Sequence, residues 1–152
     1  MLRFTTLIAL GAVALGLMAG SATAGAVTQK FVGPFGGTSP CNGEFVFGSG
    51  PGHAVYEQND GHFVLHFAMR VKATGNLGND YLLAVTANEQ FAAPTQTFPD
   101  GTTAFDLPVR LLAVSHGRAP NFESLFTLRI FVFDAEPVGS TFLGPETETC
   151  RG

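Results

Sequence analysis

The side chains of Glu57, His62 and His66 are the first candidates for metal binding or acid–base catalysis. Two histidines four residues apart can share a metal ion on a helix, but on a strand their Cα atoms lie about 13 Å apart. A two-residue turn at Asp60-Gly61 would place Glu57 diagonally between the two histidines, on the polar face of a hairpin. This group could bind a metal or act as a general base. The alternative is a solvent-facing ribbon of ordinary exposed side chains.

Nucleophilic and zinc-cluster chemistry find little support in the sequence. It contains no Gly-x-Ser-x-Gly motif, and Ser115 and His116 are adjacent rather than arranged as a triad. Two cysteines cannot supply a site of four thiolates. The sequence therefore leans away from an enzyme, and we assign no catalytic residue, no metal ligand and no cofactor.

The charge of the chain argues against nucleic acid as a partner. Its 152 residues include 8 Lys+Arg against 12 Asp+Glu, a formal net charge of −4. No basic excess is left to neutralise phosphates. The hydrophobic fraction of 45% is ordinary for a globular protein, and the length suits one domain.

Residues 1–24 predict a cleaved signal peptide. Arg3 supplies the positive start, residues 4–18 are apolar or small, and Ala22-Thr23-Ala24 is a small-residue cleavage pattern. The apolar run of about 15 residues is shorter than the roughly 20 of a spanning helix. We expect no membrane span after cleavage, and a secreted or periplasmic location.

Cys41 and Cys150 lie near the two ends of the exported chain. Thiols pair in oxidising compartments, so an even number of cysteines in an exported protein predicts a disulfide. Two free buried thiols are the alternative. A bridge that closes so long a loop would stabilise the fold by up to about 4–5 kcal/mol.

The remainder of the chain alternates between apolar and polar residues. Phe63, Leu65, Phe67, Met69 and Val71 share one face, and the same period runs through residues 81–91, 103–115 and 124–134. This period indicates strands with one buried face. Short Gly- and Pro-containing turns fit direct returns between neighbouring strands.

We therefore predict an all-β fold, an antiparallel meander of about seven strands joined at its ends by one disulfide. An up-and-down barrel is favoured over a β-sandwich, because closure removes exposed edges and accommodates long strands. Residues 41–152 form the single domain, preceded by an irregular lead-in at residues 25–40.

Two apolar features bear on function. The chain has 15 phenylalanines and no tryptophan, and the rings on the inward rows would form a packed core or line a cavity for a small apolar ligand. The outward parity also carries apolar residues, which would form one patch: Leu112, Val114, Leu125, Phe131 and Phe133. We expect this patch to be covered, either by Phe31 and Phe35 of the lead-in or by a protein partner or second copy.

Several short motifs together resemble those of an uncharacterised family of small exported bacterial proteins. They are the Pro40-Cys41-Asn42-Gly43-Glu44 opening, the histidine-containing hairpin, Ala119-Pro120-Asn121-Phe122, and the closing Thr149-Cys150-Arg151. The resemblance spans Pro40 to Arg151. It implies export and a disulfide-linked β fold, and it implies no activity.

These observations favour an exported, non-catalytic β domain that acts through its surface as a binding or structural module. The alternative is a carrier of a small apolar ligand, or a barrel enzyme of the isomerase or cyclase class with a site in its lumen.

The signal peptide gives a direct prediction. Because Ala22-Thr23-Ala24 has the small side chains that signal peptidase requires, exported protein should begin at Gly25. Intact-mass analysis of protein from the periplasm or medium measures this, and a mass that retains Met1 would contradict it.

Overall fold

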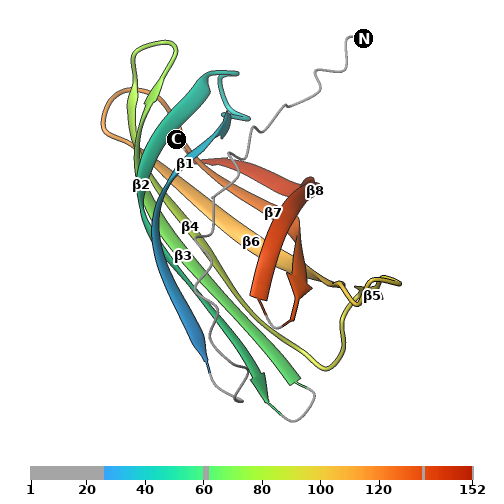
Figure 1. Ribbon diagram of the computed structural model, residues 1–152. Coiled ribbons are helices and arrows are strands. Elements are labelled where there is room, and N and C mark those ends of the chain that lie inside the picture. The colour runs from blue at the N-terminus through green and yellow to red at the C-terminus, as the bar shows by residue number, and fades with distance from the viewer. Residues whose placement is uncertain (1–25, 60–61, 135, 152) are drawn as a thin grey trace.

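The computed structural model describes residues 26–59, 62–134 and 136–151 (Figure 1). The predicted signal peptide and its cleavage site lie outside the described residues, as does the Asp60-Gly61 turn. No helix occurs in the part of the chain that the structure describes.

The described chain is a single antiparallel sheet. Its strands are β1 (Val27–Thr38), β2 (Phe45–Asn59), β3 (His62–Gly75), β4 (Asp80–Phe91), β5 (Gln96–Thr97), β6 (Thr103–Ser115), β7 (Asn121–Phe133) and β8 (Glu136–Arg151). The order in the sheet is β1-β2-β3-β4-β6-β7-β8, with the short β5 paired to β6. Every pairing is antiparallel, so the predicted all-β meander is confirmed.

The expectation of an irregular lead-in is wrong, because residues 27–38 form β1. This strand pairs with β2 from Val27↔Tyr56 to Thr38↔Phe45. Its apolar period is hard to recognise because glycines and Pro34 occupy positions where side chains would alternate. Backbone hydrogen bonds to a neighbour, rather than side-chain pattern, make this segment a strand.

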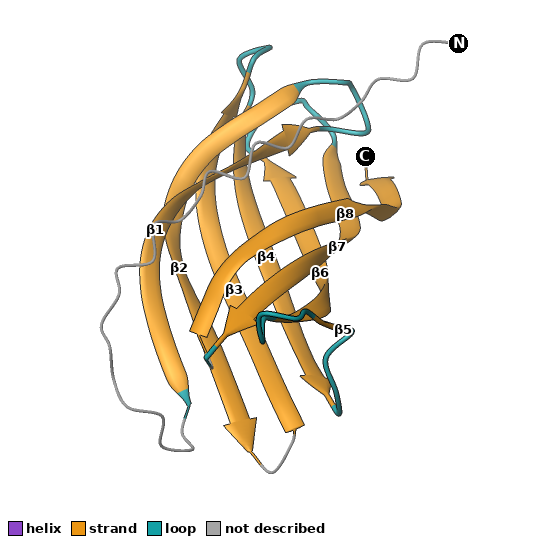
Figure 2. Ribbon diagram, turned by 45° about the vertical axis from the view of Figure 1, so that its right-hand side comes forward, coloured by secondary structure: helices purple, strands orange, loops and turns teal. Residues whose placement is uncertain are grey.

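The sheet curls into a half-barrel (Figure 2). The up-and-down order matches the prediction, but β1 and β8 remain the two edge strands and do not pair. Proline interrupts both edges, at Pro34 in β1 and at Pro137 and Pro145 in β8. Pairing of β7 with β8 also shifts register at three places. Such irregular edges resist pairing with another chain.

The inner face of the half-barrel holds the core. The alternating rows predicted from the sequence lie on this face, and aromatic rings meet across it. Phe63 and Phe91 both pack on Phe105, with ring centroids 4.8 and 5.2 Å apart, and Tyr81 meets Phe122 edge-on. The buried residues of the core are Val46, Tyr56, Leu65, Met69, Val71, Ala73, Tyr81, Leu83, Val85, Ala87, Phe105, Leu107, Val109, Leu111, Ala113, Phe122, Phe126, Leu128 and Val132.

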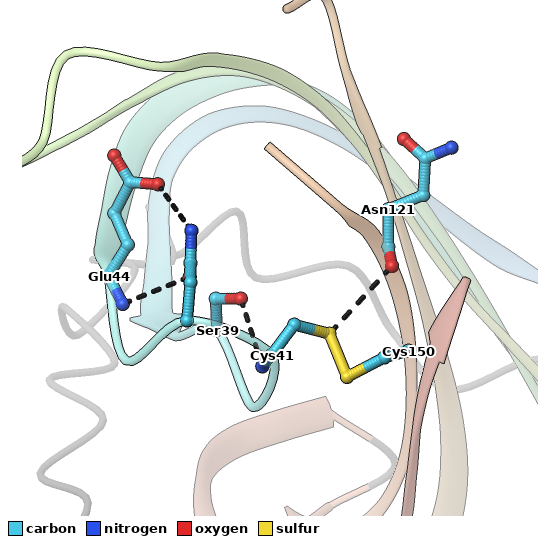
Figure 3. Close-up of a disulfide and its surroundings, with 6 residues drawn as sticks. Ser39, Cys41, Glu44, Asn121 and Cys150 are labelled. Atoms are coloured by element: carbon cyan, nitrogen blue, oxygen red, sulfur yellow. Dashed lines mark hydrogen bonds between the residues drawn. A yellow bond between two sulfur atoms is a disulfide. The ribbon is translucent and has the colours of Figure 1, made fainter. Parts of the chain in front are cut away.

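A disulfide joins the two edges of the sheet at one end. Cys41 lies in the turn between β1 and β2, Cys150 lies near the end of β8, and their Cα atoms are 5.6 Å apart (Figure 3). The predicted bridge is therefore confirmed. The turn is held by Ser39, whose Oγ accepts a hydrogen bond from the Cys41 N–H at 3.3 Å and whose N–H donates to the Glu44 carbonyl.

Glycine allows β2 to bend tightly over β3. A Cβ placed on Gly50 would lie 1.8 Å from the carbonyl oxygen of Arg70, so no side chain fits there. The same holds at Gly48, where the Lys72 carbonyl would be 2.1 Å away. The close approach lets β2 run as one bent strand through this glycine-rich stretch.

Gly50→Ala tests this bend. The methyl group must push β2 away from the β3 backbone, which we expect to cost about 2 kcal/mol or more. Gly139→Ala in β8 is the control, since a Cβ there meets nothing within 4 Å, and it should change stability by less than about 0.5 kcal/mol. Urea unfolding measures both, and equal stability of the two variants would contradict the account.

Candidate binding surface

The interior of the half-barrel offers little space to a ligand. A cavity of about 50 Å³ lies at the seam between β1 and β8, against Phe35, Leu111, Phe126 and Phe142. Sites for small molecules usually measure about 300–1,000 Å³. Side chains of the core fill the curve of the sheet, so the outer face is the larger area open to a partner.

Glu44 is a buried carboxylate for which the sequence alone suggested no role. The residue is 1% exposed and immediately precedes β2. The carboxylate accepts hydrogen bonds from the Leu77 N–H at 3.0 Å, from Asn79 Nδ2 at 2.9 Å and from the Tyr81 hydroxyl at 2.8 Å. Asn42 Nδ2 also donates to it, at 3.2 Å. Glu44 thus joins the β1–β2 turn to the β3–β4 loop.

The pKa of Glu44 reflects two opposing effects. Burial disfavours the charged form and raises the pKa, but the hydrogen bonds from Asn79, Tyr81, Leu77 and Asn42 outweigh it. The net pKa lies below the ordinary value of 4.5. The carboxylate is therefore held ionised, with its oxygens engaged by structural donors, and it is poorly placed to act as a general acid or base.

A sequence signal for Glu44 existed. It shares the inward parity of Val46 and Gly48, so a charged group at this position must be buried and must find donors nearby. The two glycines around it serve this arrangement. Gly43 has a positive φ of 70°, and a Cβ on Gly75 would lie 1.9 Å from Glu44 Oε1.

The histidine hairpin has the predicted register but a different pairing of rings. Val55 lies opposite His66, Glu57 opposite Val64, and the backbone of Asn59 opposite His62. His62, however, is exposed at the start of β3, while the ring of His66 lies against His53 with centroids 5.3 Å apart. Extending the same register by two residues would have identified His53.

A metal site is not formed there. Within residues 26–59, 62–134 and 136–151, no group of three or more His, Cys, Asp and Glu side chains could hold a metal ion. Glu57, His62 and His66 share the outer face of the hairpin without converging as three ligands.

The predicted outward parity of β6 and β7 is correct for all five apolar residues. Leu112 is half-buried, and Val114 and Leu125 are exposed. Strand β4 adds Leu82, which lies opposite Val114. Leu82, Leu112 and Val114 form one group, which we call the outer apolar patch. The ion pair of Arg110 with Glu123 lies between this group and Leu125.

Phe131 and Phe133 do not belong to this patch, so the expectation of a single row is wrong. Phe131 is six residues from Leu125, about 20 Å along the strand. The bidentate ion pair of Arg129 with Asp106, at 2.7 and 2.8 Å, occupies the outer face between them. Phe131 instead packs on Phe98 beside β5, with ring centroids 6.0 Å apart, while Phe133 stays exposed.

The lead-in does not cover the outer apolar patch. Phe31 and Phe35 of β1 point to the inner face and pack against the core, with Phe31 stacked on Phe67. The predicted cover by these rings is therefore wrong. Since β1 pairs at the far edge of the sheet, its side chains cannot reach the outer face of β6 and β7.

Comparisons with known proteins give no information on function. No protein-family model, curated protein or solved structure matches this chain. The resemblance to exported bacterial proteins stays a prediction. No helix among the described residues is long and apolar enough to cross a membrane.

Glu44→Gln tests the buried carboxylate. The glutamine side-chain amide presents an N–H donor to groups that themselves donate. We therefore expect the free energy of unfolding to fall by about 2–3 kcal/mol at neutral pH. Because folding lowers the pKa of Glu44, its stabilisation is complete above 4.5 and is lost as the pH falls through the folded-state pKa. The difference between wild type and variant should therefore shrink in acid.

Urea unfolding at about pH 7 and about pH 3 measures this difference. Glu148→Gln, on exposed β8, removes the same charge as a control and should have little effect. A difference between wild type and Glu44→Gln that is independent of pH would contradict the role assigned to the carboxylate.

Proposed function

We propose that this protein is an extracytoplasmic, non-catalytic binding module that recognises a protein partner through the outer face of its half-barrel. The outer apolar patch carries the proposal. Leu82 and Val114 are 36% and 40% exposed and lie directly opposite one another on β4 and β6, with Leu112 two residues from Val114 on the same face. A soluble monomer rarely leaves such apolar side chains grouped without a use for them.

Charged residues border the patch as in a protein interface. Glu123, opposite Leu112, accepts from Arg110 and Arg151 at 2.6 Å each. An apolar centre with a polar rim is the usual anatomy of a binding surface. The ion pairs contribute little to the stability of the fold because both arginines are exposed. Their value would be to orient a partner.

The proposed extracytoplasmic location is supported by the signal peptide predicted from the sequence and by the disulfide. The Cys41–Cys150 bridge is of a kind that persists in oxidising compartments. The interior supports binding rather than carriage or catalysis, because its cavity of about 50 Å³ is far smaller than a ligand site. Glu44 is committed to the fold by its hydrogen bonds.

The double variant Leu82→Ser with Val114→Ser tests the proposal. Both side chains point outward, so the fold should survive while the centre of the patch becomes polar. Immobilised wild-type protein should retain a partner from the extracytoplasmic fraction of the producing cells, and the variant should retain about tenfold less.

Val138→Ser with Leu143→Ser is the matched control, because it removes similar exposed apolar side chains from β8. Retention equal in both double variants would contradict the proposal. Sedimentation velocity of the purified proteins tests for self-association. If the wild type is a dimer and the Leu82→Ser, Val114→Ser variant is a monomer, the partner is a second copy of this chain.

A further inference from the structure

A groove crosses the outer face of β1, β2, β3 and β4 beside the outer apolar patch. Its volume is about 810 Å³. It exists because the small residues Ala68 and Ala84 lie in the middle of this face between larger neighbours. Ala84 lies opposite Leu112, so the groove is continuous with the patch.

Cationic side chains line this groove. Lys30 lies directly opposite His53 across β1 and β2, and Arg70 follows on β3. Among the described residues, Lys30, Arg70, Lys72 and Arg118 form no ion pair, whereas Arg110, Arg129 and Arg151 are all paired. In a chain of net charge −4, two of these four unpaired cations, Lys30 and Arg70, line one hollow.

The residues around Lys30 and Arg70 also bear on the binding of an anion. The ring of His66 lies against His53, and a second groove of about 290 Å³ continues from the shared Thr86 past His66 to Arg110. Glu57 is an acid on the same face of β2, four residues from His53, or about 13 Å along the strand. An anion placed between Lys30, His53 and Arg70 would be stabilised by all three.

The shape of the groove suits an extended peptide. Four neighbouring strands span about 14 Å, the length of four or five extended residues. Its aliphatic lining, including Val32, Pro51 and Ala68, fits alternate apolar side chains, while Arg70 offers a guanidinium for a carboxylate. An acidic glycan would favour exposed aromatic platforms, but the Phe31 ring is stacked on Phe67.

From this combination we infer that the groove binds an extended acidic segment of the partner, with its carboxylates held by Lys30, His53 and Arg70. The inference rests on the proposed function and specifies the chemistry of the partner. The apolar patch then contacts the body of the partner, and the groove contacts its acidic strand.

Titration with a fluorescent peptide of alternating glutamate and valine tests the inference by anisotropy. Wild type should bind this peptide, and a peptide of alternating lysine and valine should not bind. Lys30→Glu and Arg70→Glu should each weaken binding about tenfold. Ala68→Leu, which fills the floor without changing charge, should weaken it as well, because the site is a hollow and not only a charge.

Arg118→Glu is the matched control. It makes the same charge change at an exposed position in the β6–β7 loop, outside the groove. Equal loss of binding in Arg118→Glu would overturn the inference in favour of non-specific attraction, as would unchanged binding in Lys30→Glu and Arg70→Glu. Lys30→Gln and Arg70→Gln remove the charges more gently, and circular dichroism verifies that each variant is folded.

Two further outcomes separate the possible failures. Polygalacturonate that binds with the same dependence on Lys30 and Arg70, while the peptide does not bind, would overturn the inference in favour of an acidic glycan. If the peptide does not bind but capture still depends on Leu82 and Val114, the acidic segment is refuted and the binding module stands. If the peptide binds as expected but capture is independent of those residues, the groove stands and the proposed patch fails.

Discussion

One end of the half-barrel depends on a buried negative charge, the carboxylate of Glu44. Burying such a group is unfavourable unless donors surround it, and here they come from segments distant in sequence: Leu77, Asn79 and Tyr81 lie 33, 35 and 37 positions away. The carboxylate can be satisfied only when the β1–β2 turn and the β3–β4 loop meet. The disulfide from Cys41 to β8 holds the opposite edge against the same turn. The hydrogen bonds of Glu44 and the disulfide both hold this end of the open sheet together.

The curvature of the sheet decides where function can be located. Glycines at 48 and 50 let β2 approach the β3 backbone more closely than any side chain would allow. The curl brings inward rings into mutual contact and fills the interior, which leaves a cavity of about 50 Å³. The groove and the outer apolar patch lie outside, where the small residues Ala68 and Ala84 leave a hollow beside Leu112. A filled half-barrel therefore favours recognition by the outer face.

The alternation of residues along each strand predicted correctly which face of the sheet a side chain occupies. It did not predict which side chains on that face lie next to one another. Alternation placed Leu112, Leu125 and Phe133 correctly on the outer face. It could not show that Arg129 and Asp106 would divide them, because an ion pair between strands depends on register. The pairing of His53 with His66 was accessible from the turn register. Strand β1 was missed because its glycines remove the side chains on which an alternating pattern depends.

The amino-acid sequence alone predicts strands β3, β4, β6 and β7 with their buried faces, the register of the histidine hairpin and the pairing of the two cysteines. These properties depend on period, on turn residues and on an even cysteine count, all of which are local or countable. The folded structure adds that the sheet stays open at β1 and β8, that Glu44 is enclosed by donors, and that Lys30, His53 and Arg70 line one groove. Each of these requires strands distant in sequence to adopt a particular curvature and spacing, and no local pattern records that geometry.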